Sequence, residues 1–332
     1  MILELINSNN KFRPFFKSGE TNHLPMALYA MEKLNATEKE MKHFIVEYEK
    51  THDMEKLHVA KSVIYENNWI EYLGNNDMFE DYQVFFNSEI KRLGWEKTII
   101  TYFNRIISGI ASEAFHCLIK LCYAIESKNS EEVVNGLAYS CACYFEIPTI
   151  EKDKSKKSVA EIIKDIENSN WFSKHTYEGN TISKKLIKVF HDPEFSTHIQ
   201  FPDFTNEVVI QQLKNSVLKI HLAKWNFISL HMVTSFHSLK IIEPFILNKE
   251  DLYIKYWTSI IGCLLAINKV ANTNSALDIV CDFSWEVTFK KAIETMDEHA
   301  IKLVYSCFME YNLSHDFLFE AIASKATNQM CI

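Results

Sequence analysis

The sequence predicts an all-α fold, in the form of one large and irregular helical bundle. Two observations lead to this prediction. Apolar residues recur at the helical period along most of the chain. The 332 residues also include only seven glycines and six prolines. That is too few for the turns of a β-sheet protein or for a glycine-rich nucleotide-binding loop.

Helical signals can be followed in order along the first half of the chain. Pro25 fits the first turn of a helix over 24–34, where its missing N–H is harmless. Thr37 and Glu40 have the spacing of a capping box and mark the start of the next helix. Ser130 has a side chain suited to the N-cap of a later helix. Periodicity predicts the further helices of this half at 77–91, 96–108, 110–127 and 131–146.

The stretch 147–204 differs from its surroundings because it is more polar and its helical patterns, 159–168 and 181–190, are short. Long patterns resume after it, at 206–243, 249–271, 276–295, 297–311 and 314–326. No internal repeat of fixed period is present. We therefore expect a single domain over residues 1–332, with 147–204 as a polar insertion on its surface.

The charge pattern does not indicate a nucleic-acid partner. The net charge is −8, and the basic residues are scattered along the chain. The densest basic stretch, 151–158, is interrupted by acids, as in a solvated linker, whereas a nucleic-acid footprint needs a basic face. The sequence contains neither a P-loop nor a G-x-G-x-x-G motif, so nothing points to a phosphate-binding loop.

Cellular location is indicated by the cysteines and by the absence of a long apolar run. None of the eight cysteines forms a C-x-x-C pair, and six of them lie in apolar helical patterns, as buried reduced thiols do. The longest uncharged apolar run, 256–268, is too short to span a bilayer. The N-terminus lacks the order of a signal peptide. We expect a cytoplasmic protein without a membrane partner; its oligomeric state is not indicated.

The segment 295–307, TMDEHAIKLVYSC, places His299 and Lys302 on one face of an otherwise apolar helix. Two interpretations are open from these residues alone. In the first, the helix is amphipathic and Lys302 extends to water along a narrow polar stripe. In the second, both side chains point inward and belong to a site.

Other helices repeat this arrangement. His116 lies among apolar residues in the pattern at 110–127, and His231 and His237 do so in LHMVTSFHSLK. His23 precedes the helix that begins with a proline, where a side chain can point inward without disturbing helical packing. A single histidine of this kind is more often a hydrogen-bonded core residue than a metal ligand. Histidines on several separate elements, however, could form a rigid site for iron, zinc or copper.

The segments that carry these residues resemble the questin oxidase-like family. The resembling stretches are NHLPMALYAMEKLNA (22–36), AFHCLIKLCYAIES (114–127), LAYSCACYF (137–145), LHMVTSFHSLK (230–240) and DEHAIKLVYSC (297–307). They occur in the family's order and span most of the chain, except the insertion. The resemblance implies an α-helical oxidoreductase. The better-known fungal members open anthraquinone-type rings, by Baeyer–Villiger-like or dioxygenase chemistry.

The resemblance also implies a set of site residues. Some ring-cleaving members look like non-haem iron enzymes, in which four histidines and a carboxylated lysine hold Fe(II). Carried over to this sequence, the metal ligands are His23, His116, His231, His299 and Lys302. His237 lies in the same motif as His231, and is an alternative ligand or a catalytic residue beside the metal. Lys120 stands where many relatives carry arginine, which puts a bidentate contact there in doubt.

A carboxylated lysine is physically reasonable at position 302. A lysine amine must be neutral to capture CO₂, and burial beside a cation favours the neutral form. The resulting carbamate is an anionic oxygen ligand that would partly offset the charge of Fe(II). The resemblance therefore implies a non-haem iron-dependent oxygenase that acts with O₂ on a small aromatic or quinol-type substrate, with Lys302 and His237 as its catalytic residues.

Three alternatives remain open from the sequence. A ferritin-like di-iron protein is suggested by Glu-x-x-His motifs that end at His23, His43, His52, His58 and His116. A metal-free oxygenase that uses a flavin or NADPH would also suit the family's Baeyer–Villiger-type reactions. A non-catalytic helical scaffold would instead use the polar stretch 147–204 as its interaction surface.

Overall fold

The computed structural model describes residues 2–151, 153–267 and 283–328. The regular elements of these residues are all helical, which confirms the predicted all-α class. Three isolated bridges are the only β-type pairings among the described residues. The predicted patterns 249–271 and 276–295 extend in part over 268–282, which lie outside the described residues.

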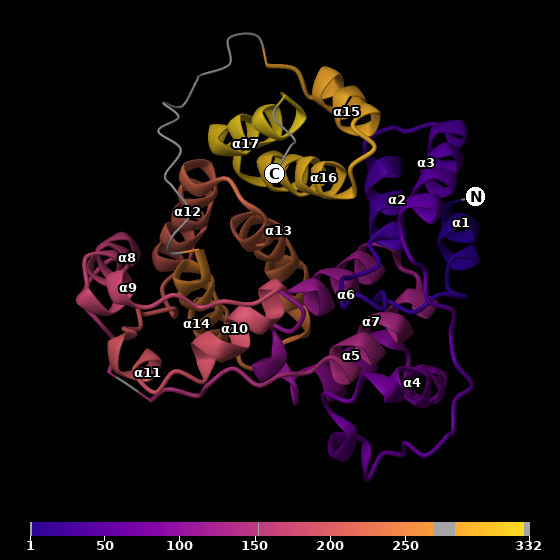
Figure 1. The fold of residues 1–332 in the computed structure, drawn as a ribbon, viewed down its shortest axis with the longest axis horizontal. Helices are drawn as coiled ribbons and strands as arrows, with labels where there is room; N and C mark the ends of the chain where they lie inside the picture. The colour runs from indigo at the N-terminus through magenta and orange to yellow at the C-terminus, as the bar shows by residue number, and fades with distance from the viewer. Residues whose placement is uncertain (1, 152, 268–282, 329–332) are drawn as a thin grey trace.

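The first seven α-helices form one side of the molecule (Figure 1). They are α1 (Ile2–Ser8), α2 (Leu24–Lys33), α3 (Glu38–Thr51), α4 (Phe79–Leu93), α5 (Trp95–Phe103), α6 (His116–Ser127) and α7 (Ser130–Ala142). Four shorter helices follow within the polar stretch: α8 (Val159–Glu167), α9 (Asn170–Lys174), α10 (Ile182–Phe190) and α11 (Phe195–His198). The chain continues with α12 (Glu207–Lys224), α13 (Phe227–Ile242), α14 (Lys249–Ile267), α15 (Trp285–Glu294), α16 (Glu298–Ser314) and α17 (Phe317–Asn328).

The local signals for helix starts are mostly found in the structure. Thr37 and Glu40 form both hydrogen bonds of the predicted capping box at α3. Pro25 lies in the first turn of α2. The prediction of Ser130 as an N-cap was wrong by one position. The preceding residue, Asn129, caps α7 because its side-chain oxygen accepts from the N–H groups of Glu131 and Glu132.

Two predicted helices are interrupted where the sequence has no glycine or proline. The pattern 206–243 is divided between α12 and α13, because Trp225 adopts a left-handed conformation (φ +37°) and Asn226 caps a new helix. The pattern 110–127 becomes helical only at His116. The residues just before it form turns with left-handed backbone. Both interruptions lie directly before site residues.

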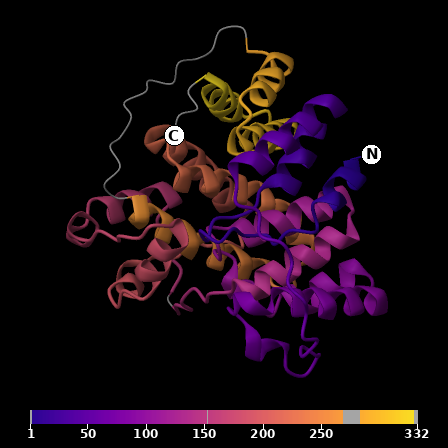
Figure 2. The ribbon, with the colours of Figure 1, turned by 45° about the vertical axis from the view of Figure 1, so that its right-hand side comes forward.

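The core is built around α6, nearly all of whose side chains are buried. This helix packs against α7 and α13, while α13 packs against α16, and α16 against α2. Close packing of α6 and α7 depends on Gly136. A Cβ atom at Gly136 would lie 2.8 Å from Cα of Leu121 in α6. In two views of the ribbon, α15, α16 and α17 form a layer at the same edge of the molecule (Figures 1 and 2).

The polar stretch 147–204 packs onto the bundle through α10 and α14. Gly262 of α14 allows this contact, because a Cβ atom there would lie 2.5 Å from the ring of Phe190 in α10. Leu186, Val189 and Phe190 of α10 are buried. The start of α10 lies beside the turn before α6, because Ser183 donates a hydrogen bond to Glu113.

The described helices include none that is both long and apolar enough to cross a membrane. The cysteines within the described residues are free and buried, namely Cys117, Cys122, Cys141, Cys143, Cys263 and Cys307.

Candidate metal centre

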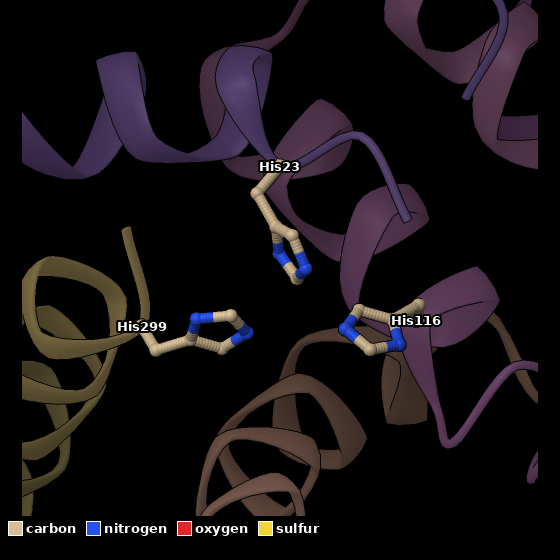
Figure 3. Close-up of side chains that lie close together, drawn as sticks. All are labelled: His23, His116 and His299. Atoms are coloured by element: carbon tan, nitrogen blue, oxygen red, sulfur yellow. The ribbon is translucent and has the colours of Figure 1, made fainter. Parts of the chain in front are cut away.

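Five side chains from four helix starts converge in the interior. His23 is the residue directly before α2, and His116 is the first residue of α6. His231 lies near the start of α13, whereas His299 and Lys302 lie near the start of α16. Figure 3 shows the rings of His23, His116 and His299 facing one another across a common space. A position at a helix start lets each side chain leave its helix without interrupting the apolar packing of later turns.

Each of the four histidine rings lies close to two of the others. The ring centroids of His23 lie 4.7 Å from His116 and 4.5 Å from His299, and those of His116 and His231 are 4.4 Å apart. His231 and His299 are 5.8 Å apart. One nitrogen from each of His23, His116 and His299 lies within 4.8 Å of the others. This spacing is suitable for ligands of a single metal ion.

Backbone carbonyl groups orient two of these rings. Nδ1 of His231 lies 2.6 Å from the carbonyl oxygen of Phe227, and Nδ1 of His116 is in contact with that of Glu113. A carbonyl oxygen can only accept, so each Nδ1 carries the hydrogen and each Nε2 keeps a lone pair. Second contacts of this kind commonly fix metal-binding histidines. Here they aim both Nε2 atoms at the interior.

The two Nε2 atoms of His116 and His231 are 2.9 Å apart. With the tautomers set by the carbonyl groups, two lone pairs face each other and no hydrogen is available between them. A cation beside both nitrogens would turn this repulsion into attraction. The donor set of neutral imidazoles therefore fits a bound transition-metal ion.

Burial keeps the histidines in the neutral form that binds metals. Burial, together with the charge of Lys302, lowers the pKa of His23 well below its usual value. Burial and the neighbouring His231 lower the pKa of His116 in the same way, and burial and His299 lower that of His231. At neutral pH these three rings are thus uncharged, and their lone pairs are free to bind a cation.

Lys302 is buried, with 3% of its surface exposed, and its Nζ atom contacts Nδ1 of His23. The interpretation in which Lys302 extends to water is therefore wrong. Desolvation lowers the pKa of Lys302 to about 7, although the carboxylates of Glu298 and Asp297 oppose this effect. A substantial fraction of the amine is then neutral at pH 7, as carboxylation by CO₂ requires.

The helix starts also create a favourable field for negative charge. Four helices, α2, α6, α13 and α16, begin at the cluster. The N-terminal end of each helix carries a partial positive charge. In α16 this charge is already balanced in part, because Asp297 accepts from the N–H groups of His299 and Ala300. The remaining field favours an anionic group beside the histidines.

A pocket of about 380 Å³ opens onto the cluster. Its walls include all four histidines and the apolar side chains of Phe16, Ala114, Ile182 and Phe227. Its polar walls include Glu20, Glu113 and Glu298, with Asn180, Thr181 and Ser183 from the polar stretch. A cavity of this size can take a small flat molecule with one face against the histidines.

His237 is not part of this cluster. Its Nδ1 lies 2.9 Å from a carboxylate oxygen of Glu310, and its Nε2 lies 3.4 Å from one of Glu126. Burial alone would lower the pKa of His237, but the two carboxylates outweigh it and raise the pKa to about 9. A protonated imidazole cannot bind a metal, so the geometry favours His231 over His237 as the ligand.

Lys120 has a charged partner outside the histidine cluster. It forms a buried ion pair with Glu132 of α7, with 2.7 Å between Nζ and Oε2. Lysine and glutamate are here a structural pair between α6 and α7, so the position does not need the bidentate geometry of arginine.

Sequence reasoning did not identify several pocket residues. Phe227 contacts the ring of His299 (5.0 Å between centroids), and its position after the capping residue Asn226 was the available signal. The wall formed by 180–183 carries no recognisable motif, and its role depends on the packing of α10. The periodicity of 110–127 predicts a helical position for Glu113, whereas this residue lies in the turn before α6.

Comparison with known protein families agrees with this architecture. Residues 21–307 match the model of the family described as Questin oxidase-like. His23 and Lys302 both lie within the matched range, as do the three other converging side chains. No curated protein matches the chain at a significant level.

Proposed function

Because the chain belongs to the questin oxidase-like family, a name that suggests an oxidase or oxygenase, we propose that it is a mononuclear, non-haem iron-dependent oxygenase. The iron would be held by four histidines and by the carboxylated form of a lysine, namely His23, His116, His231, His299 and Lys302. Fe(II) suits a site of neutral imidazoles with one anionic oxygen ligand.

The observation that carries this proposal is the 2.9 Å approach of Nε2 of His116 to Nε2 of His231. Two carbonyl groups hold the hydrogens of these rings on the opposite nitrogens. An arrangement of facing lone pairs in a buried core is costly unless a cation is bound. A structural role for these histidines would not require their lone pairs to meet.

Carboxylation of Lys302 would complete the site. A bond forms between Nζ of the neutral amine and the carbon of CO₂ as one C=O π bond opens to give the carboxylate, and Nζ releases one proton to solvent. Burial of Lys302 favours the neutral amine that reacts, and the four helix starts favour the negative charge that results. The carbamate would give the site one oxygen ligand and reduce its net positive charge.

Iron, when bound, supplies the redox chemistry that lets O₂ react with an organic molecule. The protein's own groups bind and orient the substrate and exclude water from the reacting face. Phe16, Ile182 and Phe227 provide an apolar wall for an aromatic or quinol-type ring. We propose that such a ring is oxygenated next to the histidines, in a ring-opening or Baeyer–Villiger-like reaction.

The geometry supports one metal more than two. A ferritin-like di-iron centre needs paired glutamates and histidines. Among the described residues, the two groups that could hold a metal are His23–His116–His299 and Asp297–Glu298–His299, and they share His299. The pocket also gives little support to NADPH, because three glutamates and no lysine or arginine line it within the described chain.

Measurement of the iron content and a ¹³C NMR spectrum would test the proposal. Protein purified without chelators should contain about one iron per chain. After incubation with ¹³C-bicarbonate, its NMR spectrum should show a carbamate carbon that is missing in Lys302→Met. Transition-metal-free protein from iron-rich medium would contradict the metal site. Full iron occupancy in Lys302→Met, with an unchanged carbon spectrum, would contradict only the lysine ligand.

A further inference from the structure

Glu113 lies at the point where the polar stretch 147–204 meets the metal centre. Its backbone carbonyl group contacts Nδ1 of His116, and its carboxylate accepts a hydrogen bond from Oγ of Ser183, 3.1 Å from Oε2. Both Glu113 and Ser183 line the pocket. One residue thus contacts a candidate metal ligand through its backbone and the pocket wall through its side chain.

The turn that carries Glu113 has an uncommon backbone. Glu113, Ala114 and Phe115 have φ angles of +49°, +53° and +70°, in a region that residues other than glycine rarely adopt. Three such residues in succession persist only where the surroundings hold them. In this turn, the backbone conformation directs the carbonyl group of Glu113 to His116 while its side chain reaches Ser183 in α10.

The second carboxylate oxygen of Glu113 remains available to a ligand. Oε1 accepts no hydrogen bond from any side chain or backbone group that the structure describes, whereas Oε2 is held by Ser183. Glu113 is half-buried and faces a cavity large enough for a small aromatic molecule. A carboxylate in such a place gains from a hydrogen-bond donor that reaches it through the cavity.

The charge of the pocket limits what that donor can be. The described lining includes three carboxylates, Glu20, Glu113 and Glu298, and no lysine or arginine. Away from the histidines and the helix starts, the described lining therefore offers no cationic side chain that could pair with an anionic ligand. An uncharged ring that carries a hydroxyl group is attracted through its O–H and fits the apolar wall of Phe16 and Phe227.

We propose that Glu113 is the residue that selects and anchors the substrate, by accepting a hydrogen bond at Oε1 from a hydroxyl group of an uncharged aromatic molecule. Ser183 holds the carboxylate in position for this contact. Because the same turn contacts His116, the anchored ring keeps a fixed place relative to the four histidines. The binding step deepens the function proposed above, but it does not require the metal.

Binding of two matched compounds to metal-free protein tests the proposal. The probes are a dihydroxynaphthalene and its dimethyl ether. They share a ring system, but only the diol has hydroxyl groups that can donate a hydrogen bond. Calorimetry should show that the wild-type protein prefers the diol. In Glu113→Gln the affinity for the diol should fall about tenfold, because a charge-assisted hydrogen bond becomes a neutral one. The affinity for the ether should be unchanged.

Two further variants make the result specific. Glu167→Gln removes the same charge from an exposed position on α8, outside the pocket, and both compounds should bind it as they bind the wild type. Ser183→Ala leaves the carboxylate but removes its support, so only diol binding should weaken, about threefold. Ser183→Ala also carries the test if Glu113→Gln fails to fold, as judged by circular dichroism.

Three results would overturn the proposal. The first is that the diol does not bind to the wild-type protein. The second is that diol and ether lose affinity equally in the Glu113 or Ser183 variants. The third is that Glu167→Gln weakens diol binding as much as Glu113→Gln does. Iron content is measured separately on each variant. Selective diol binding by a protein that never takes up iron would sustain the anchor while contradicting the iron-dependent function.

Discussion

The Nε2 atoms of His116 and His231 approach to 2.9 Å, while the opposite nitrogen of each ring contacts a backbone carbonyl group. The two residues are 115 positions apart in the chain and come from the starts of different helices. Their approach is the observation on which the proposed cation site rests.

Replacement of His231 by alanine should have opposite effects on metal binding and on the metal-free protein. Loss of a ligand should weaken Zn²⁺ binding by at least about 100-fold, since even loss of a residue behind a ligand costs 10–100-fold. Without metal, the variant should unfold at the same temperature as the metal-free wild type or at a higher one. The reason is that the lone pairs on Nε2 of His116 and Nε2 of His231 no longer face each other. Competition with a chromophoric chelator and thermal unfolding measure the two effects.

His237→Gln provides the matched control, because it alters the same helix outside the cluster. It should leave Zn²⁺ affinity within about twofold of the wild type. Equal affinities in His231→Ala and the wild type would show that His231 is not a ligand.

The buried His237 should make stability depend on pH in the alkaline range. Its pKa is about 9 in the folded protein, against an ordinary value of 6.5. The imidazolium therefore stabilises the fold fully below pH 6.5, and this contribution is lost as pH rises through about 9. It amounts to about 3 kcal/mol, taking about 1.4 kcal/mol for each tenfold change in proton affinity. Urea unfolding between pH 6 and pH 10 measures the loss.

In His237→Gln the same titration should show a much flatter profile between pH 6.5 and 9. The carboxylates of Glu126 and Glu310 remain in that variant, so its stability at pH 6 should be lower than that of the wild type. Parallel profiles for the two proteins would contradict the assignment of a charged His237.

The ion pair between Lys120 and Glu132 should matter through its burial. Both side chains are at most 5% exposed, so Lys120→Met leaves a carboxylate without a partner in the core. We expect a loss of about 3 kcal/mol in the free energy of unfolding. A second change, Glu132→Gln, removes the isolated charge and should restore part of this loss, as measured by urea unfolding.

An exposed ion pair supplies the comparison for Lys120. Lys157 and Asp165 are about half exposed, so Lys157→Met should change stability little. Similar losses in Lys120→Met and Lys157→Met would mean that burial is not the reason for the effect.

Gly262→Ala should disturb the contact between α10 and α14. A Cβ atom at this position would lie 2.5 Å from the ring of Phe190, which must move. Overpacking of this kind costs about 1–3 kcal/mol. The double variant with Phe190→Leu should recover most of the loss, because the smaller side chain vacates the space. Thermal unfolding of the wild type and the two variants measures these changes in stability. If Gly262→Ala is as stable as the wild type, the contact is not tightly packed.

Much of the helical architecture was predictable because each helix carries its own signals. The capping box at Thr37 and the proline at position 25 depend only on neighbours in the chain. The breaks at Trp225 and at Glu113–Phe115 were not predictable from glycine or proline. There the left-handed backbone is held by tertiary packing, which local sequence does not reveal.

The candidate site was predictable in its residues but not in its geometry. Four of the converging side chains interrupt apolar patterns, whereas His23 precedes a helix, and the family motifs brought all five together. Periodicity could not choose between His231 and His237, because α13 is buried on nearly all sides and thus has no distinct inner face. The role of Ser183 depends on how α10 packs, which its own polar sequence does not specify.

The contact between His23 and Lys302 joins residues 279 positions apart. During synthesis, the ribosome therefore releases the first of the proposed ligands long before the last. No partial chain that stops short of α16 can hold the metal with all five side chains. Iron loading would thus be a late event in the life of the protein, after translation has passed residue 302, and a nascent chain would not compete for the metal with its full set of ligands.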